Sequence, residues 1–390
     1  MFRTACLACQ SSRLTELIDL GMHPCADTFI PAEKLSEPDL LYPLMVDACQ
    51  VCGQVQTRTE VPPAVRYVQQ DYSYTSGNSA TSRAHWTAFA EEVSQRVGLS
   101  PKAFVLEIGS NDGFLAEQFQ QRGCQVLGVE PSPHVAAMAD LRKVPTIRQY
   151  FSTELIACLP VQPQLIVANN VLNHMNDPLD VLTAVKILLA PGGTFVFEVP
   201  DWTRLVVSGS FDQIYHEHVT YWTRASAVAI CHRVGLVVTA IEPVDYHGGS
   251  LRVYVQHRGT AVAAEEPQLT QEDYALWRAQ VERQRKNFWL WMADRYDRQP
   301  LVCVGAAAKA NTFLNYYKLD RTLVRAVTDA SPSKIGKWTP GTRIPIARDQ
   351  ILARLEYPLV LLTAWNLAEA LQRTLSAINP SVQYLNPYAA

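Results

Sequence analysis

The chain has 390 residues, more than one ordinary domain core holds, so two or three domains are expected. Hydrophobic residues make up 48% of it and charged residues 18%, a balance that excludes a disordered or fibrous protein. The formal net charge of −3 shows no excess of Lys and Arg, so nucleic acid is not an expected partner.

Targeting signals are not apparent in the sequence. The N-terminus MFRTACLACQ lacks the apolar core of a signal peptide, and no stretch reaches the roughly 18 apolar residues that cross a bilayer. We therefore expect a cytoplasmic protein without a membrane partner. Thiols stay reduced in that compartment, so the nine cysteines need an explanation other than disulfides.

Four of the cysteines form two C-x-x-C pairs, Cys6 with Cys9 and Cys49 with Cys52. Such pairs are typical of zinc knuckles, and four protein ligands leave no open position, so the metal is expected to be structural. A redox pair is disfavoured because neither pair opens a helix after a βαβ strand. We predict a zinc-binding domain over residues 1–66, with Cys25 or His23 left open as competing ligands.

An alternation of short apolar runs and helical segments begins near residue 103. The runs are FVLEIG, CQVLGVE, LIVANNVL and GGTFVFEVP. This βαβ rhythm predicts an α/β domain with a parallel, doubly wound sheet, placed over residues 67–260. Open sheets of this kind bind ligands at the carboxyl ends of their strands.

A second α/β rhythm follows a charged helical stretch from Glu272 to Arg298. Its segments are LVCVGAAAKANTFLNYY, VRAVTDASPSKIGKW and YPLVLLTAWN, which predict a Rossmann-like domain over residues 261–390. Lys309 follows a small-residue turn that suits an anion at a helix N-terminus. The turn lacks the Walker pattern, so ATP is not indicated, and it lacks the spaced glycines of a dinucleotide site, which weakens an NAD interpretation.

The first strand of the central domain leads into a glycine-containing turn. It ends at Glu107, and Gly109, Asn111 and Gly113 fall on the turn. Glycine lets a backbone approach a ligand closely, and Glu130, seventeen residues beyond Gly113, ends the next strand, where a carboxylate can accept both ribose hydroxyls. The combination favours a nucleoside ligand.

The segment FDQIYHEHVTYW places Tyr215, His216, Glu217 and His218 in succession. An extended segment would put Tyr215 and Glu217 on one side, whereas a helical turn would bring Tyr215 and His218 together. Either arrangement offers a base and a phenol or carboxylate to one substrate. A metal site of two histidines and a glutamate, and a purely structural loop, remain open.

The motifs together resemble a known family. E-x-G-x-x-x-G resembles the first motif of class I S-adenosylmethionine-dependent methyltransferases. With the two C-x-x-C pairs, YHEH, HGGSLRV at 247–253, GAAAKANTFLNYY and DASPSKIGKWTPGTRIPI, the whole chain resembles the sugar C-methyltransferases.

That resemblance implies a zinc-binding N-terminal domain, a central Rossmann-type class I methyltransferase domain and a C-terminal Rossmann-like domain without a cofactor. The implied substrate is a 4-keto deoxysugar linked to thymidine diphosphate. His218 would be the general base, Tyr215 and Glu217 would line the sugar, His174 would lie near the reacting centre, and Tyr72 or Tyr74 would cover the site. The cofactor contacts would be Glu107, Gly109, Asn111, Gly113, Glu130, Asn169 and Asn170.

The chemistry also follows from the residue types. A carbon beside a ketone becomes nucleophilic once a base removes its proton and the enolate is stabilised. Histidine suits the base because its pKa lies near working pH, and a tyrosine or second histidine can donate to the enolate oxygen. His247 and Arg252 are expected to bind substrate phosphate or to join the central and C-terminal domains; the forked donors of arginine suit phosphate.

Three alternatives are compatible with the same sequence. The same fold can methylate oxygen, nitrogen or a carbon of a non-sugar acceptor. A nucleotide-sugar oxidoreductase would use NAD in the C-terminal domain, and a non-catalytic zinc scaffold would bind proteins but leave YHEH unexplained. We expect a monomer or weak dimer.

Overall fold

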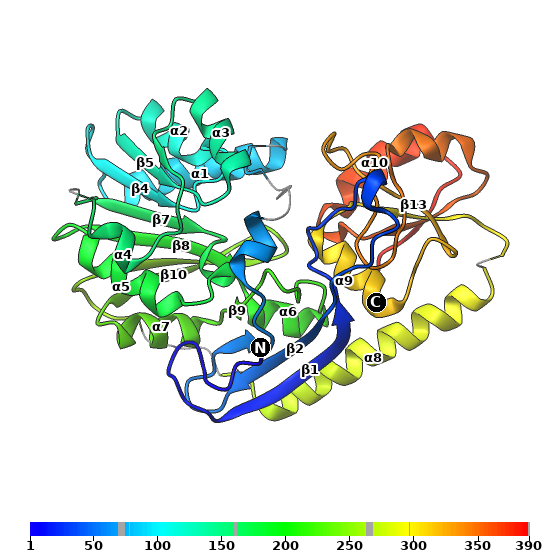
Figure 1. Ribbon diagram of the computed structural model, residues 1–390, viewed down its shortest axis with the longest axis horizontal. Coiled ribbons are helices and arrows are strands. Elements are labelled where there is room, and N and C mark those ends of the chain that lie inside the picture. Colours follow the sequence, from blue (N-terminus) through cyan, green and yellow to red (C-terminus); the bar gives the residue numbers. More distant parts are fainter. Residues whose placement is uncertain (69–74, 78, 160–161, 263–267, 296, 389–390) are drawn as a thin grey trace.

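The computed structural model describes residues 1–68, 75–77, 79–159, 162–262, 268–295 and 297–388, and these residues form three β-sheets. One sheet lies in the central part of the chain, one in the C-terminal part, and one is built mainly from the N-terminal residues (Figure 1). The prediction of an α/β protein with two Rossmann-like parts is confirmed.

The central sheet has the order β10-β11-β8-β7-β4-β5-β6. Its strands from β6 to β8 are parallel, and β11 is antiparallel to both β8 and β10. The sequence order reverses direction between β4 and β7, which makes their carboxyl ends a topological switch point, the usual ligand site of such sheets. The strands are β4 (Phe104–Ile108), β5 (Gln125–Val129), β6 (Thr146–Ile147), β7 (Leu165–Asn169), β8 (Thr194–Pro200), β10 (Val237–Val244) and β11 (Ser250–Gln256).

Helices cover both faces of this sheet because alternate strand residues point to opposite sides. Val105 and Val167 pack in one core with α1 (Ala80–Arg96), α2 (Phe114–Gln121) and α3 (Pro133–Leu141). Leu106 and Ile166 pack in another core with α4 (Thr153–Ile156), α5 (Pro178–Leu188) and α7 (Arg224–Arg233).

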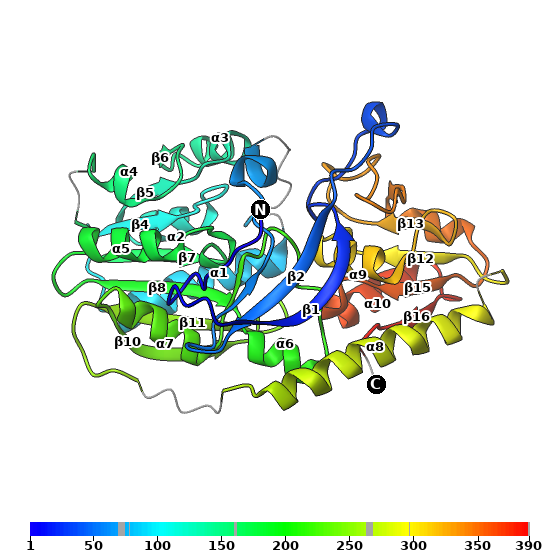
Figure 2. The ribbon, with the colours of Figure 1, turned by 60° about the horizontal axis from the view of Figure 1, so that its bottom comes forward.

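The N-terminal sheet is antiparallel, in the order β1-β2-β3-β9. Its strands are β1 (Leu14–His23), β2 (Tyr42–Cys49), β3 (Val55–Thr57) and β9 (Thr220–Tyr221). The β1–β2 ribbon extends from the central part towards the C-terminal part (Figures 1 and 2). The loop beyond it, with η1 (Ala32–Lys34), continues to the C-terminal part, where Ile30 and Trp338 exchange two backbone hydrogen bonds of 2.8 Å. The N-terminal segment therefore joins the other two parts.

The C-terminal sheet is parallel, in the order β14-β13-β12-β15-β16. Its elements are β12 (Leu301–Val304), α9 (Ala308–Tyr317), β13 (Val324–Thr328), β14 (Ile346–Ala347), η4 (Asp349–Arg354), β15 (Leu359–Leu362), η5 (Trp365–Leu367), α10 (Ala368–Ile378) and β16 (Gln383–Leu385). The expected charged helix is α8 (Gln271–Ala293), which packs against α6 (Trp202–Ser208), and its Trp277 indole N–H donates to the Ser210 carbonyl at 2.8 Å.

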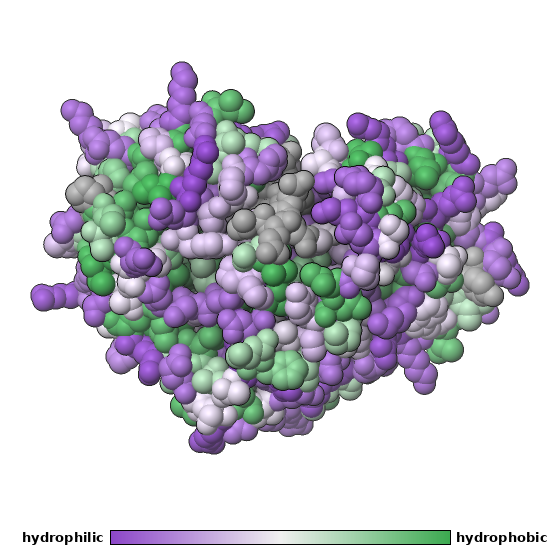
Figure 3. Space-filling model, in the orientation of Figure 1, coloured by the Kyte–Doolittle hydropathy of each residue, from purple (hydrophilic) through white to green (hydrophobic). Residues whose placement is uncertain are grey.

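The surface is largely hydrophilic on the side seen in Figure 3, where hydrophilic residues cover most of the face. Among the described residues, no helix combines the length and apolar character needed to cross a membrane.

Candidate active site

A cavity of about 320 Å³ opens at the switch point of the central sheet. All three parts of the chain contribute to its wall. Representative lining residues are Arg66 from the N-terminal part, Asn111, Glu130 and Asn169 from the central part, and Lys309 and Lys334 from the C-terminal part.

The turn after β4 requires its glycines. Gly109 and Gly113 have φ of 65° and 75°, and a Cβ on Gly109 would stand 2.4 Å from Cγ2 of Val171. Gly109 and Asn111 line the cavity, as expected of cofactor contacts. Gly113 does not; it is the N-cap of α2.

Glu130 is held rigidly at the end of β5. Its two carboxylate oxygens accept backbone N–H groups from Asn111 at 3.0 Å and Ser132 at 2.8 Å, while burial raises its pKa. Glu107 is also buried, and burial followed by the charge of Asp112 raises its pKa. Glu107 is not among the residues that line the cavity, and its role as a cofactor contact stays a prediction.

Asn169 and Asn170 both line the cavity at the end of β7. Asn169 Oδ1 accepts the backbone N–H of Glu198 at 2.9 Å, and its buried Nδ2 has no hydrogen-bond partner among the described residues. An unsatisfied buried donor is costly unless a ligand accepts from it. This donor and the fixed Glu130 carboxylate fit the polar groups of a nucleoside cofactor.

Tyr215 and His218 are brought together by a turn, the second arrangement considered above. The His218 backbone N–H donates to the Tyr215 carbonyl at 2.9 Å, and the Tyr215 hydroxyl lies 2.6 Å from His218 Nε2. His218 Nδ1 lies 2.9 Å from the Gln213 carbonyl, which can only accept, so Nδ1 carries the proton and Nε2 accepts from Tyr215. Burial lowers the pKa of His218 and raises that of Tyr215, so both are neutral.

His174 and Glu217 also line the cavity. The ring centroids of His174 and His218 are 4.8 Å apart, and burial lowers the His174 pKa to about 3. The Glu217 carboxylate accepts backbone N–H groups from Ala26 at 3.2 Å and Asp27 at 3.1 Å, and burial raises its pKa. Glu217 therefore anchors the N-terminal segment against the site.

His216 does not line the cavity, and its Nε2 lies 3.2 Å from the Tyr42 carbonyl. In the part of the chain that the structure describes, the group with metal-binding geometry consists of cysteines, so the metal interpretation of YHEH is not supported.

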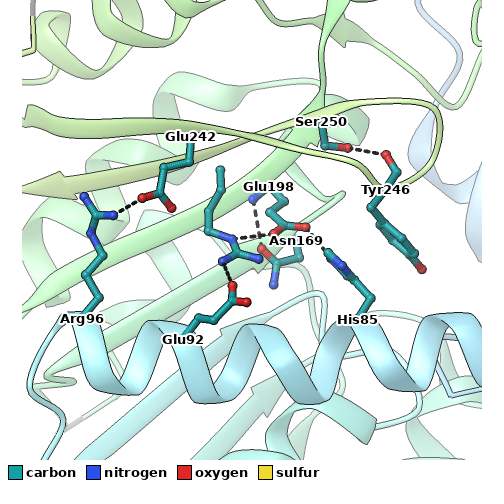
Figure 4. A network of polar contacts seen from close by, with 9 residues as sticks. His85, Glu92, Arg96, Asn169, Glu198, Glu242, Tyr246 and Ser250 are labelled. Carbon is teal, nitrogen blue, oxygen red and sulfur yellow. Dashed lines mark hydrogen bonds and ion pairs between the residues drawn. The ribbon is translucent and has the colours of Figure 1, made fainter.

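Arg252 requires a correction, because it does not line the cavity. Its guanidinium donates to Glu198 and Glu92, both at 2.7 Å. His85 Nε2 lies 2.8 Å from the other oxygen of Glu198, and Figure 4 labels these three partner residues. These partners all belong to the central part, so Arg252 neither faces a substrate phosphate nor joins two domains. His247 does line the cavity. Tyr72 and Tyr74 lie outside the described residues.

Several lining residues were not expected from the sequence: Arg66, Tyr67, Gln213 and Lys334. Gln213 lies in FDQIYHEHVTYW and Lys334 in DASPSKIGKWTPGTRIPI, although neither was singled out, whereas Arg66 and Tyr67 belong to no recognisable motif. They reach the cavity through contacts between segments far apart in the chain, for which one sequence carries no local signal.

The Cys6, Cys9, Cys49 and Cys52 sulfurs all lie within 4.8 Å of one another. Cys6 and Cys52 are 3.6 Å apart and Cys9 and Cys49 3.5 Å apart, close to the roughly 3.8 Å between sulfurs of a tetrahedral zinc site with Zn–S bonds of about 2.3 Å. The group includes neither His23 nor Cys25.

The central part is a Rossmann-type domain with a cavity at its switch point, and sequence models of domain families identify this chain as a methyltransferase. A methyltransferase domain matches residues 83–241, a zinc binding domain matches residues 6–67, and a C-methyltransferase C-terminal domain matches residues 245–382.

The C-methyltransferase NovU of Streptomyces niveus is 29% identical over 383 residues, covering 93% of this chain and 90% of NovU. A ubiquinone biosynthesis O-methyltransferase of Pseudomonas fluorescens is 31% identical over 110 residues, 27% of this chain and 47% of that protein. The solved glycopeptide N-methyltransferase MtfA with S-adenosylmethionine is 18% identical, with a TM-score of 0.36 over 44% of this chain and 87% of MtfA. The chain is an S-adenosylmethionine-dependent C-methyltransferase related to NovU, with a zinc-binding N-terminal domain.

Proposed function

We propose that the enzyme methylates the carbon α to the ketone of a nucleotide-linked 4-keto deoxysugar, in the cytoplasm, through an enolate. The domains are proposed to span residues 1–66, 67–260 and 261–390. Gly109, Asn111, Glu130, Asn169 and Asn170 hold S-adenosylmethionine, which supplies the methyl group when bound.

The neutral Tyr215–His218 pair is the observation that carries this proposal. His218 Nε2 has its lone pair directed at the Tyr215 hydroxyl, and both side chains line the cavity that holds the cofactor contacts. The Tyr215 oxygen takes the proton of the α-carbon while its own hydroxyl proton passes to His218 Nε2, so Tyr215 is again neutral and His218 becomes an imidazolium. The electrons of the broken C–H bond form the carbon–carbon double bond, and the ketone oxygen becomes negative. Carbon methylation needs such a base.

The charges of the cavity support an anionic acceptor. Lys309 and Lys334 line it from the C-terminal part, near the N-terminus of α9, while Glu130 lines it from the central part. The diphosphate of a nucleotide would contact the two lysines, and the positively charged cofactor would lie near Glu130. His247, which also lines the cavity, is proposed to contact the acceptor.

Mass spectrometry after incubation with S-adenosylmethionine and a panel of thymidine-diphosphate 4-keto deoxysugars tests this function. We expect methylation of at least one 4-keto sugar and none of the matching 4-hydroxy sugars. Methylation of both series alike would contradict a mechanism that needs the ketone.

A further inference from the structure

A second tyrosine–histidine pair faces the first one. The Tyr67 hydroxyl lies 2.7 Å from His174 Nδ1, just as the Tyr215 hydroxyl lies 2.6 Å from His218 Nε2. The two histidine rings meet edge to face, with centroids 4.8 Å apart and planes at 80°. All four side chains line the cavity. The site therefore has two such pairs, while proton removal uses only one.

Arg66 supports this second pair from behind. It is only 3% exposed, and one guanidinium nitrogen donates to the Tyr67 oxygen at 3.2 Å and to the His174 carbonyl at 3.0 Å. The other terminal nitrogen donates to Asn176 Oδ1 at 2.7 Å. Tyr67 and Arg66 belong to one turn of π-helix, η2 (Ala64–Val68), so a single element presents both to His174.

The hydrogen-bond acceptors of Arg66 among the described residues are all neutral: Tyr67 Oη, Asn176 Oδ1 and the carbonyls of Val61, His174 and Glu217. Buried cations in proteins are normally paired with an anion. A buried cation without a carboxylate at hydrogen-bond distance keeps much of its electrostatic field, because no adjacent negative charge cancels it. The field of Arg66 therefore stabilises negative charge that develops in the cavity. An enolate oxygen is such a charge.

We propose that Tyr67 is a positioning residue that holds His174 towards the developing enolate oxygen, and that Arg66 supplies positive field behind it. This rests on the proposed function. The bond at Nδ1 fixes the His174 ring, so Nε2 lies on the side away from Tyr67. One Tyr–His pair takes the proton of the acceptor, and the other pair stabilises the oxygen that becomes negative.

Exchange of solvent deuterium into the acceptor measures enolate formation apart from methyl transfer. The probe is a thymidine-diphosphate 4-keto-6-deoxy sugar, with S-adenosylhomocysteine filling the donor site. We expect Tyr67→Phe to slow exchange roughly tenfold or more at saturating sugar, the effect of about one lost hydrogen bond, with KM unchanged. Tyr316→Phe is the matched control, because it also removes a buried phenol hydrogen bond, to Glu282 on α8, and should leave exchange unchanged.

The double variant shows whether Tyr67 acts through His174. In a His174→Ala background, Tyr67→Phe should slow exchange little further, because the ring that Tyr67 positions is gone. Normal exchange by Tyr67→Phe, or equal losses in both backgrounds, would overturn the inference while leaving the proposed function intact. Absence of exchange in the wild-type enzyme would overturn the proposed function, and the inference with it.

Discussion

At the scale of single residues, the chemistry depends on burial that keeps His218, His174 and Tyr215 neutral. His218 and His174 have lowered pKa values because burial penalises their charged forms, and Tyr215 has a raised pKa for the same reason. A neutral imidazole is ready to accept a proton, whereas an imidazolium is not. Removing His218 should therefore abolish the chemistry without removing the cofactor contacts.

His218→Ala is expected to lower turnover by at least roughly 100-fold, the smaller effect typical of a lost general base. Binding of S-adenosylmethionine, measured by calorimetry, should stay within a factor of about two, since the cofactor contacts are on other elements. His216→Asn is the control, because this buried histidine lies outside the cavity wall. Equal turnover in His218→Ala and the wild type would remove the assigned base.

The pH dependence follows from the direction of the His218 shift. An unperturbed histidine is half protonated near pH 6.5, and a lowered pKa keeps His218 neutral, and active as a base, to more acidic pH. The acid limb of kcat/KM is therefore expected below about pH 6.5. An acid limb of kcat/KM at or above about pH 6.5 that shifts when His218 is replaced would contradict the assignment of His218 as a base with a lowered pKa.

At the scale of elements, local spacing predicted the features whose residues lie close together in the sequence. Residue spacing reveals three such features, each confined to a few residues: the C-x-x-C pairs, the turn after Glu107 and the Tyr215–His218 turn. Arg252 was misinterpreted because its partners, Glu198 on β8 and Glu92 on α1, come from other elements. Arg66 and Tyr67 were missed for the same reason. The three domain boundaries remain predictions.

The zinc knuckles stabilise an interface between elements. Cys6 and Cys49 are buried in the same core as Trp222 and Ile230 of the central part. We expect Cys49→Ser to lower the zinc content and the midpoint of thermal unfolding, because structural zinc contributes directly to folding. Cys158→Ser, which alters an exposed thiol outside the cluster, should change neither. Full zinc content and an unchanged midpoint in Cys49→Ser would contradict a structural site.

At the scale of the whole molecule, the cavity is completed by the C-terminal part, which carries Lys309 and Lys334. If these lysines bind the nucleotide diphosphate, Lys334→Gln should raise the KM for the sugar nucleotide roughly tenfold, as expected for one charge-assisted hydrogen bond. The affinity for S-adenosylmethionine should not change. Lys337→Gln, three residues away and outside the cavity wall, is the control. An equal KM for the sugar nucleotide in Lys334→Gln and Lys337→Gln would show that the diphosphate does not bind at Lys334.

The central claim is that the acceptor atom is a carbon made nucleophilic beside a ketone. Transfer from S-adenosylmethionine with a carbon-13-labelled methyl group, followed by nuclear magnetic resonance of the product, tests it most directly. We predict one-bond carbon–carbon coupling between the new methyl group and the sugar carbon adjacent to the ketone. A labelled methyl bound to oxygen or nitrogen, without that coupling, would contradict the account.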